Sequence, residues 1–263
     1  MEKLLFEACE DGNLGHVQQL LTYPNINPNF QDRSGSTPLH IACEMGQVSI
    51  VKLLIGDKRV RINKGNRYQV SPFYIACREG QFEVVKLLLN DERIQANQED
   101  KDGVTPFNTT CFKGHFQIVR LLLRDPRIDV NKEDQLGFTP LLNSCLQGHT
   151  EVVKVLINDN RVDVNRAEKM TRITPCFIVC QLGHLEILQY MLASGRQINV
   201  NTKDWIERDS IQVARENERS EIVELLESFQ KNPNGLRMNL KKQLGLFGKN
   251  FNYYDYYFFF KKK

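Results

Sequence analysis

The stretch YIACREGQFEVVKLLL, from Tyr74 to Leu89, contains a cysteine that returns at a fixed interval along the chain. Five cysteines follow one another in steps of 34 residues, and a sixth comes 35 residues after the fifth. These register cysteines are Cys9, Cys43, Cys77, Cys111, Cys145 and Cys180, and Cys176 alone is out of register. Self-similarity at such a period predicts stacked copies of one supersecondary unit.

The residues around each cysteine predict two short helices separated by a glycine. In STPLHIACEMG, Thr37 suits an N-cap and Pro38 suits the first helical position, where the missing N–H costs nothing. Gly46 then ends this helix in a left-handed conformation. The next ten residues, QVSIVKLLIG, place apolar side chains at helical spacing. With a polar turn between units, the sequence predicts an all-α solenoid of stacked helix-turn-helix units.

The same pattern resembles a known family. Ser-Pro or Thr-Pro pairs begin four further units, and GSTPLHIACEMGQVSIVKLL and GVTPFNTTCFKGHFQIVRLLL are similar to ankyrin repeats. The resemblance covers about residues 2–229 and implies protruding β-hairpin-like turns beside a concave groove. The units depart from the family's usual length of about 33 residues, and Asn90 or Asn158 is expected to take the left-handed turn after a second helix.

The resemblance also divides the chain. We expect an ankyrin-repeat domain over residues 1–229, with an N-terminal cap over 1–30 and a C-terminal cap over 207–229. The repeats between the caps are expected to start near residues 35, 69, 103, 137 and 172. Residues 230–263 form a basic, aromatic tail of low complexity that is expected to be disordered, although LRMNLKKQLGLFG within it is weakly amphipathic.

Three explanations compete for the register cysteines: metal binding, disulfide bonding and packing. Stacked helices lie roughly 8–10 Å apart, whereas a disulfide needs Cα atoms within about 7 Å and zinc needs sulfur at about 2.3 Å. The family usually has a small apolar residue here, and a free cysteine behaves as one. Packing is therefore the preferred interpretation. Cys176 and Cys180, one helical turn apart, are the pair that most resembles a ligand pair.

Composition and charge narrow the class of protein. The chain has 263 residues, of which 41% are hydrophobic and 25% are charged, as in ordinary soluble proteins. The start has no long apolar segment of a secretory signal, and unpaired cysteines fit a reducing compartment. The cytoplasm is the expected location, with the nucleus as the alternative. Residues 231–263 carry eight Lys or Arg and one Asp, so the remainder carries −4 of the formal net charge of +3. An acidic array does not resemble a nucleic-acid-binding surface, so no nucleic-acid partner is expected.

No motif for catalysis or cofactor binding is found. The glycines end helices and do not open a phosphate-binding loop, and there is no Gly-x-Ser-x-Gly elbow. Four histidines follow a glycine, and the family uses a histidine there to join neighbouring loops; they are His16, His115, His149 and His184. His40 resembles the family's capping histidine. We therefore expect a protein that is not an enzyme and that has no cofactor and no metal site.

The remaining candidate is the surface. In the family, the hairpin tips and the ends of the first helices line the groove, which usually binds another protein. Several large apolar or cationic side chains fall at these positions, where exposed apolar groups indicate an interaction site. The candidate protein-binding residues are Arg33, Met45, Arg67, Tyr68, Arg78, Phe112, Leu136, Phe138, Leu146, Met170, Leu182 and Trp205. The competing explanation is that distorted hairpins fold these side chains back onto their neighbours.

Three functional readings follow. The leading one is a monomeric protein–protein interaction module, an adaptor, scaffold or inhibitor that binds through the groove and hairpin tips. The second is a tether at a membrane surface, in which the basic-aromatic tail binds the lipid. The third is a regulatory fragment of a larger channel or enzyme. The sequence does not identify the partner, because repeat surfaces serve many processes.

Overall fold

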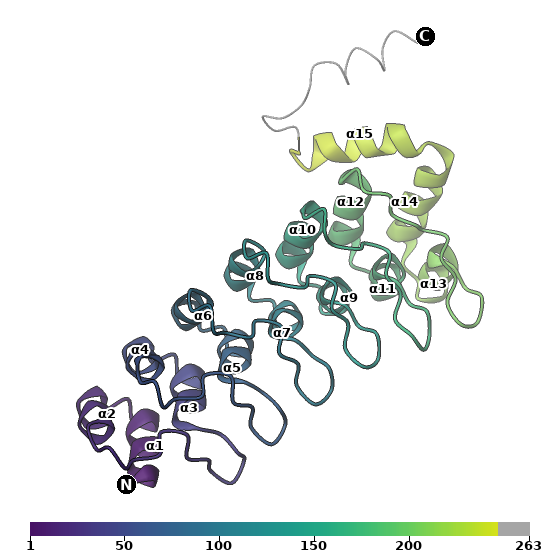
Figure 1. Cartoon of the computed structure of the whole chain (residues 1–263). Helices are drawn as coiled ribbons and strands as arrows, with labels where there is room; N and C mark the ends of the chain where they lie inside the picture. The colour runs from purple at the N-terminus through teal and green to yellow at the C-terminus, as the bar shows by residue number, and fades with distance from the viewer. Residues whose placement is uncertain (247–263) are drawn as a thin grey trace.

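The computed structural model describes residues 1–246, which form seven helix pairs followed by one further helix (Figure 1). The pairs are α1 (Glu2–Glu10) and α2 (Leu14–Leu21), α3 (Pro38–Glu44) and α4 (Val48–Gly56), α5 (Pro72–Arg78) and α6 (Phe82–Leu89), α7 (Pro106–Lys113) and α8 (Phe116–Leu122), α9 (Pro140–Leu146) and α10 (Thr150–Asn158), α11 (Pro175–Leu182) and α12 (Leu185–Ala193), and α13 (Ser210–Glu216) and α14 (Ser220–Lys231). The last helix is α15 (Pro233–Gln243). This all-α stack of helix pairs confirms the predicted fold class.

The helix boundaries follow the capping signals of the sequence. Thr105 accepts a hydrogen bond from the backbone N–H of Asn108 at 3.1 Å, and Pro106 is the first residue of α7. Gly114 ends α7 in the left-handed conformation, with φ 75°. A left-handed glycine also follows α3 and α5, at Gly46 and Gly80. Local residue preferences are therefore sufficient to define each short helix.

The helices lie in two rows that run the length of the molecule (Figure 1). The first helix of each pair belongs to the inner row, from which the loops project, and the second belongs to the outer row. One continuous hydrophobic core runs between the rows, from Leu5 in α1 to Leu240 in α15. Each pair thus buries its apolar face mainly against the pairs next to it, as expected for a repeat array.

The cysteines belong to this core. All seven are free and buried, and the six register cysteines are 0% exposed. Burial raises the pKa of the Cys9 and Cys77 thiols to about 12, so both remain protonated and unreactive at neutral pH. These observations support the packing interpretation.

A second repeated contact joins the units at the ends of the outer helices. Arg127 pairs with Asp125 at 2.7 Å, and its guanidinium also donates to the carbonyl of Leu89, the last residue of α6, at 2.6 Å. The hydrogen bond that Arg127 donates to the Asp125 carboxylate is the main reason that the pKa of Asp125 is lowered. The same spacing after an aspartate places Arg59, Arg93 and Arg161 on carbonyls near the end of the preceding outer helix. Arg196, which follows Ser194 and not an aspartate, makes the same kind of contact.

The prediction that Asn90 or Asn158 adopts the left-handed conformation is wrong. Asn90 has φ −72°, and Asn158 is the last helical residue of α10. A helix end leaves carbonyls without partners inside the helix. Here the arginine of the following repeat supplies a donor, so the turn does not need a left-handed residue at either asparagine.

The C-terminal end also differs from the expected disordered tail. Residues 233–243 form α15, which packs against α12 and α14 and buries Leu240 to 2% exposed. Arg237 of α15 donates to the carbonyl of Leu192 near the end of α12 at 3.3 Å. This contact resembles the arginine contacts of the earlier repeats. The rest of the predicted tail, residues 247–263, lies outside the described residues, and so does most of the basic-aromatic segment of the membrane-tether reading.

Candidate functional site

Six loops project from the inner row, and we refer to them as fingers (Figure 1). They comprise residues 31–36 (finger 1), 65–70 (finger 2), 99–104 (finger 3), 133–138 (finger 4), 167–173 (finger 5) and 203–208 (finger 6). Each finger is closed by a backbone hydrogen bond, such as that from the N–H of Asp100 to the carbonyl of Val104 at 3.0 Å. The Asp100 carboxylate also accepts from the N–H groups of Asp102 and Val104, both at 2.9 Å. Each tip is thus a tight turn whose backbone is fixed from within.

The tips are also joined to one another through backbone groups. The N–H of Lys101 donates to the carbonyl of Tyr68 at 3.0 Å, and the N–H of Lys169 donates to the carbonyl of Leu136 at 3.2 Å. Equivalent bonds join all six fingers in order, through Arg67 to Ser34, Gln135 to Asp102 and Trp205 to Thr171. The fingers therefore form one ladder along the molecule, and their side chains are presented at regular intervals.

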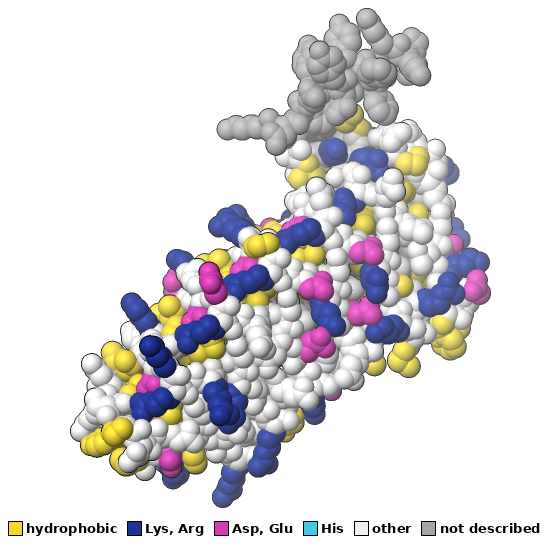
Figure 2. All heavy atoms as spheres, in the orientation of Figure 1, with side chains coloured by type: hydrophobic (Ala, Val, Ile, Leu, Met, Phe, Trp, Pro, Cys, Tyr) yellow, Lys and Arg dark blue, Asp and Glu magenta, His cyan; other side chains and the backbone are white. Residues whose placement is uncertain are grey.

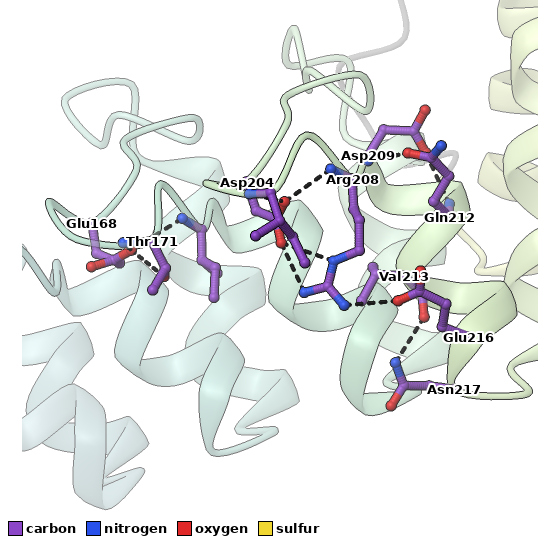
Figure 3. Close-up of polar contacts among 11 residues, drawn as sticks. Glu168, Thr171, Asp204, Arg208, Asp209, Gln212, Val213, Glu216 and Asn217 are labelled. Carbon is purple, nitrogen blue, oxygen red and sulfur yellow. Dashed lines mark hydrogen bonds and ion pairs between the residues drawn. The ribbon is translucent and has the colours of Figure 1, made fainter.

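Fingers 5 and 6 use different residues to make the same turn (Figure 3). Finger 5 has one extra residue, and Glu168 takes the place of the usual aspartate or asparagine. Its carboxylate accepts hydrogen bonds from the backbone N–H of Met170 at 2.8 Å and from the side chain of Thr171. Arg172 and Glu207 occupy the left-handed position that glycine fills in fingers 1, 3 and 4, with φ 62° and 66°.

Arg208 holds finger 6 against the last inner helix (Figure 3). Its guanidinium lies 2.8 Å from Asp204, which is 1% exposed, and 2.7 Å from Glu216 in α13. Burial alone would raise the pKa of Asp204, but the hydrogen bonds from Arg208 and the finger backbone lower it overall. Asp204 therefore stays ionised and keeps the turn that presents Trp205 and Ile206.

Most predicted site residues lie on the exposed surface of the fingers and inner-helix ends. Trp205 is 64% exposed, Met170 72%, Leu136 54% and Tyr68 53%. Met45, Phe112 and Leu182 are exposed at the C-terminal ends of α3, α7 and α11, and Arg33 and Arg67 are exposed at the tips of fingers 1 and 2. The structure thus places these side chains along one side of the molecule.

The prediction of exposure is wrong for two of the apolar residues. Phe138 is the last residue of finger 4, and Leu146 is the last residue of α9. Both are half-buried, because both pack against the core. Arg78 is also half-buried and pairs with Glu79 at 2.6 Å. Sequence reasoning left Ile206 out of the candidate residues, although its position at the tip of finger 6 makes it 47% exposed.

Hydrogen bonds below the tips keep successive inner-helix ends together. The side chains of His115 and His149 bond through Nε2 to the carbonyls of Arg78 and Phe112, at 2.8 and 2.9 Å. Gln81 makes the equivalent bond to Glu44. The predicted linking role is confirmed for these two histidines. His184 Nε2 has no hydrogen-bond partner among the described residues, and His16 lies within α2 instead.

His40 has the predicted capping role. Its Nδ1 accepts from the backbone N–H of Thr37 at 3.0 Å, so the proton lies on Nε2, which donates to the carbonyl of Val70 at 3.0 Å. The side chain is 0% exposed, and burial lowers its pKa to about 4. His40 therefore joins α3 to the base of finger 2 as a neutral imidazole.

Within residues 1–246, no group of three or more His, Cys, Asp or Glu side chains is arranged to hold a metal ion. Among these same residues, no helix combines the length and the apolar character required to cross a bilayer. A hollow of about 580 Å³ lies between α2 and α4, on the outer row and away from the fingers, with Leu14, Leu21 and Leu53 in its lining.

Comparisons with known proteins agree with this architecture. The family model described as ankyrin repeats (3 copies) matches residues 5–100 and 92–168. Among solved structures, the ankyrin repeat domain of Bcl-3, described as a unique member of the IkappaB protein family, matches with a TM-score of 0.73 and 20% identity over 84% of this chain and 97% of that one. The human ASB11 ankyrin repeat domain matches with a TM-score of 0.70 and 21% identity over 84% and 96%. No curated protein matches in sequence. At these identities, the structural likeness concerns the fold alone.

Proposed function

Because the chain belongs to the ankyrin repeat family, we propose that it is a non-enzymatic protein–protein interaction module. It acts as an adaptor, scaffold or inhibitor, and it binds a partner protein through the finger tips and the neighbouring ends of the inner helices. The observation that carries this proposal is the set of large apolar side chains exposed along the finger ladder. A polar residue would be tolerated at each of these positions, so the apolar ones call for a partner that covers them.

The residues divide into anchors and supports. Tyr68, Leu136, Met170 and Trp205 are the main anchors, because aromatic and methionine side chains are enriched in the centres of interfaces. Met45, Phe112, Leu182 and Ile206 widen the surface, and Arg33, Arg67 and Arg78 supply charge. Phe138 and Leu146 support the anchors from below, since both are half-buried.

The proposed setting is the cytoplasm or the nucleus, where the protein acts as a monomer. Seven free, buried cysteines among the described residues favour a reducing compartment. Nothing in the proposed role requires a cofactor or a nucleic acid.

Quantitative affinity capture with the full chain tests the proposal. The triple variant Leu136→Ser, Met170→Ser, Trp205→Ala is compared with wild type and with a control, Leu14→Ser, Val48→Ser, whose exposed residues lie on the outer row. We expect the triple variant to lose a partner that wild type and control both retain, by at least about tenfold. Equal loss in the control, or a partner held equally by all three, would contradict the proposal.

A further inference from the structure

Among the described residues, the finger ladder carries its tip cations without ion pairs at one end and most of its exposed apolar tip side chains at the other. The residue that follows the turn aspartate, asparagine or glutamate reads Arg33, Arg67, Lys101, Gln135, Lys169 and Trp205 from finger 1 to finger 6. The next residue reads Ser34, Tyr68, Asp102, Leu136, Met170 and Ile206. Figure 2 shows the result as dark blue side chains at the edges of the first three fingers and yellow ones at the edges of the last three.

The cations of the two halves differ in their ion pairs. Lys169 in finger 5 lies 2.8 Å from Glu133, and Arg208 in finger 6 lies 2.8 Å from Asp204. Lys203, also in finger 6, lies 3.4 Å from Glu207. Within residues 1–246, by contrast, Arg33, Arg67 and Lys101 form no ion pair. In this part of the chain, the cationic groups at the tips of fingers 1–3 are thus free of ion pairs, whereas those of fingers 5 and 6 are paired.

Four carboxylates lie in the same three fingers, those of Asp32, Glu99, Asp100 and Asp102. Asp102 is exposed beside Lys101 on finger 3. Asp32 and Asp100 accept hydrogen bonds from the finger backbone, which holds their carboxylates inside the turn, and Glu99 pairs with Lys132 at 2.9 Å. Lys101 Nζ lies 4.7 Å from the centre of the Tyr68 ring, so the lysine of finger 3 lies over the exposed aromatic ring of finger 2. An acidic group placed there would meet positive charge from two neighbouring fingers.

Resting on the proposed function, we infer that the partner is an extended polypeptide segment with an acidic end and an apolar end. Its acidic residues lie over fingers 1–3 and its aliphatic or aromatic residues over fingers 4–6, so the segment binds in one direction only. Six tips separated by the 8–10 Å of stacked helices span about 40–50 Å, which corresponds to roughly 12–15 extended residues. Complementary charge at one end fixes the register of such a segment, and burial of Leu136, Met170 and Trp205 at the other supplies most of the affinity.

A polyanion such as single-stranded nucleic acid fits the ladder less well. Its phosphates would meet unpaired cations on fingers 1–3 only, and its backbone charge would then pass over Leu136 and Met170. Binding of nucleic acids normally uses a continuous basic track. We therefore favour the polypeptide and treat the polyanion as an outcome of the test.

A library of random 16-residue peptides displayed on phage, selected on the immobilised full chain, tests the inference. We expect enriched peptides with Asp or Glu at one end and aliphatic or aromatic residues at the other. The enriched peptides are then labelled with fluorescein, and their affinities are measured by anisotropy for wild type and for three variants. These are Arg33→Glu/Arg67→Glu, Leu136→Ser/Met170→Ser, and the charge-matched control Lys52→Glu/Lys86→Glu on the outer helices α4 and α6.

The two finger variants should each weaken binding by about tenfold or more, and the control should remain within about twofold of wild type. Replacing the peptide's acidic residues with amides should weaken binding to wild type by about tenfold but change little for Arg33→Gln/Arg67→Gln. That coupling pairs the acidic end with fingers 1 and 2. Raising the salt concentration should reduce the affinity of the acidic peptide more than that of its amide version.

Four other outcomes of this experiment would contradict the inference or the proposed function. Peptides without acidic residues whose binding is lost in Leu136→Ser/Met170→Ser would overturn this inference and leave the proposed function standing. Acidic peptides that bind Arg33→Glu/Arg67→Glu as well as wild type would also overturn it. A labelled oligonucleotide that binds more tightly than every selected peptide, and that depends on Arg33 and Arg67, would replace the polypeptide with a polyanion. If no selected peptide depends on either finger variant, the proposed function itself is contradicted.

Discussion

The interior of the array and its finger tips belong to the same repeats, yet they use sequence differently. In the interior, the side chain makes the contact, and the same residue returns: a buried cysteine in six units and an arginine on the preceding helix end in five. At the tips, backbone N–H and carbonyl groups make the contact. The side chains there are Arg67, Lys101, Gln135, Lys169 and Trp205. A position is thus constrained where its side chain holds the stack and free where the main chain does so.

The largest effect is expected at a finger glycine that has a left-handed backbone and lies against the backbone of the next finger. Gly137 has φ 93°, and a Cβ there would lie 2.7 Å from the backbone nitrogen of Lys169, which donates a ladder bond. We expect Gly137→Val to lower the free energy of unfolding by about 3–4 kcal/mol, since left-handed strain and a backbone clash add together. Chemical denaturation monitored by circular dichroism measures it.

Gly195→Val is the matched control for Gly137→Val. Gly195 has a similar φ of 88°, but nothing lies within 4 Å of a Cβ added there. This variant should therefore cost only the strain, about 1–2 kcal/mol. Equal losses in the two variants would mean that the contact between fingers contributes nothing.

The second prediction concerns pH and the interior residue His40. Its pKa in the folded protein, about 4, is below the ordinary value of 6.5, so the unfolded chain binds more protons between these values. The stability contributed by neutral His40 is complete above pH 6.5 and falls as pH drops from 6.5 to 4. The loss approaches about 3 kcal/mol at the lower limit.

His40→Asn is the matched control for this pH dependence. Asn108 occupies the equivalent position and donates to the carbonyl of Phe138 at 2.9 Å, as His40 does to Val70. Denaturation curves measured from pH 7 to pH 4 should therefore diverge between wild type and variant. Parallel curves would show that the imidazole does not titrate on unfolding.

The third prediction concerns the arginine that joins outer helices. Arg127→Ala removes the donor to the carbonyl of Leu89 and the partner of Asp125. Because the side chain is 37% exposed, water replaces part of the lost contact, and we expect a loss of about 1–1.5 kcal/mol. Arg124→Ala, exposed in the same loop, should change the free energy of unfolding by less than about 0.5 kcal/mol. If both variants unfold alike, Arg127 does not act as a helix-end donor.

The smallest effect is expected at the tips. Leu136→Ser with Met170→Ser should change the free energy of unfolding by less than about 0.5 kcal/mol, because both side chains are more than half exposed. Leu141→Ser, whose side chain is 1% exposed at the start of α9, should cost several kcal/mol in the same denaturation assay. A large loss in the tip variant would show that these side chains hold the fold and are not free for a partner.

The fold could be predicted from the sequence because its signals are local. A Thr-Pro or Ser-Pro pair, with a glycine eight residues after the proline, marks five of the seven inner helices of residues 1–246, as at Thr37, Pro38 and Gly46. What the sequence did not disclose depends on contacts between distant residues. Arg93 reaches a carbonyl 38 residues earlier, and Arg237 reaches one 45 residues earlier. No local pattern distinguishes these arginines from solvated ones.

The candidate site was predictable only in outline. Periodicity places residues such as Tyr68 and Leu136 at the tips, but it does not show how deeply a neighbour packs. Phe138 lies two positions after Leu136 and is half-buried, because the chain turns back towards α9 there. Periodicity also does not show which finger cations are paired with a carboxylate. The ion pairs of Glu133 and Glu207 join residues of different fingers or of opposite sides of one turn, and only the structure reveals them.

Finger 5 shows how the array tolerates a change of length. Its extra residue leaves the bond from Lys169 in place, and Trp205 simply bonds to Thr171, one residue farther along than the usual acceptor. The insertion is therefore confined to finger 5, and finger 6 keeps its hydrogen bond to the finger before it. A repeat array of this kind can change the length of one finger while the neighbouring fingers stay aligned. Residues added within this one loop therefore need not displace the fingers on either side of it.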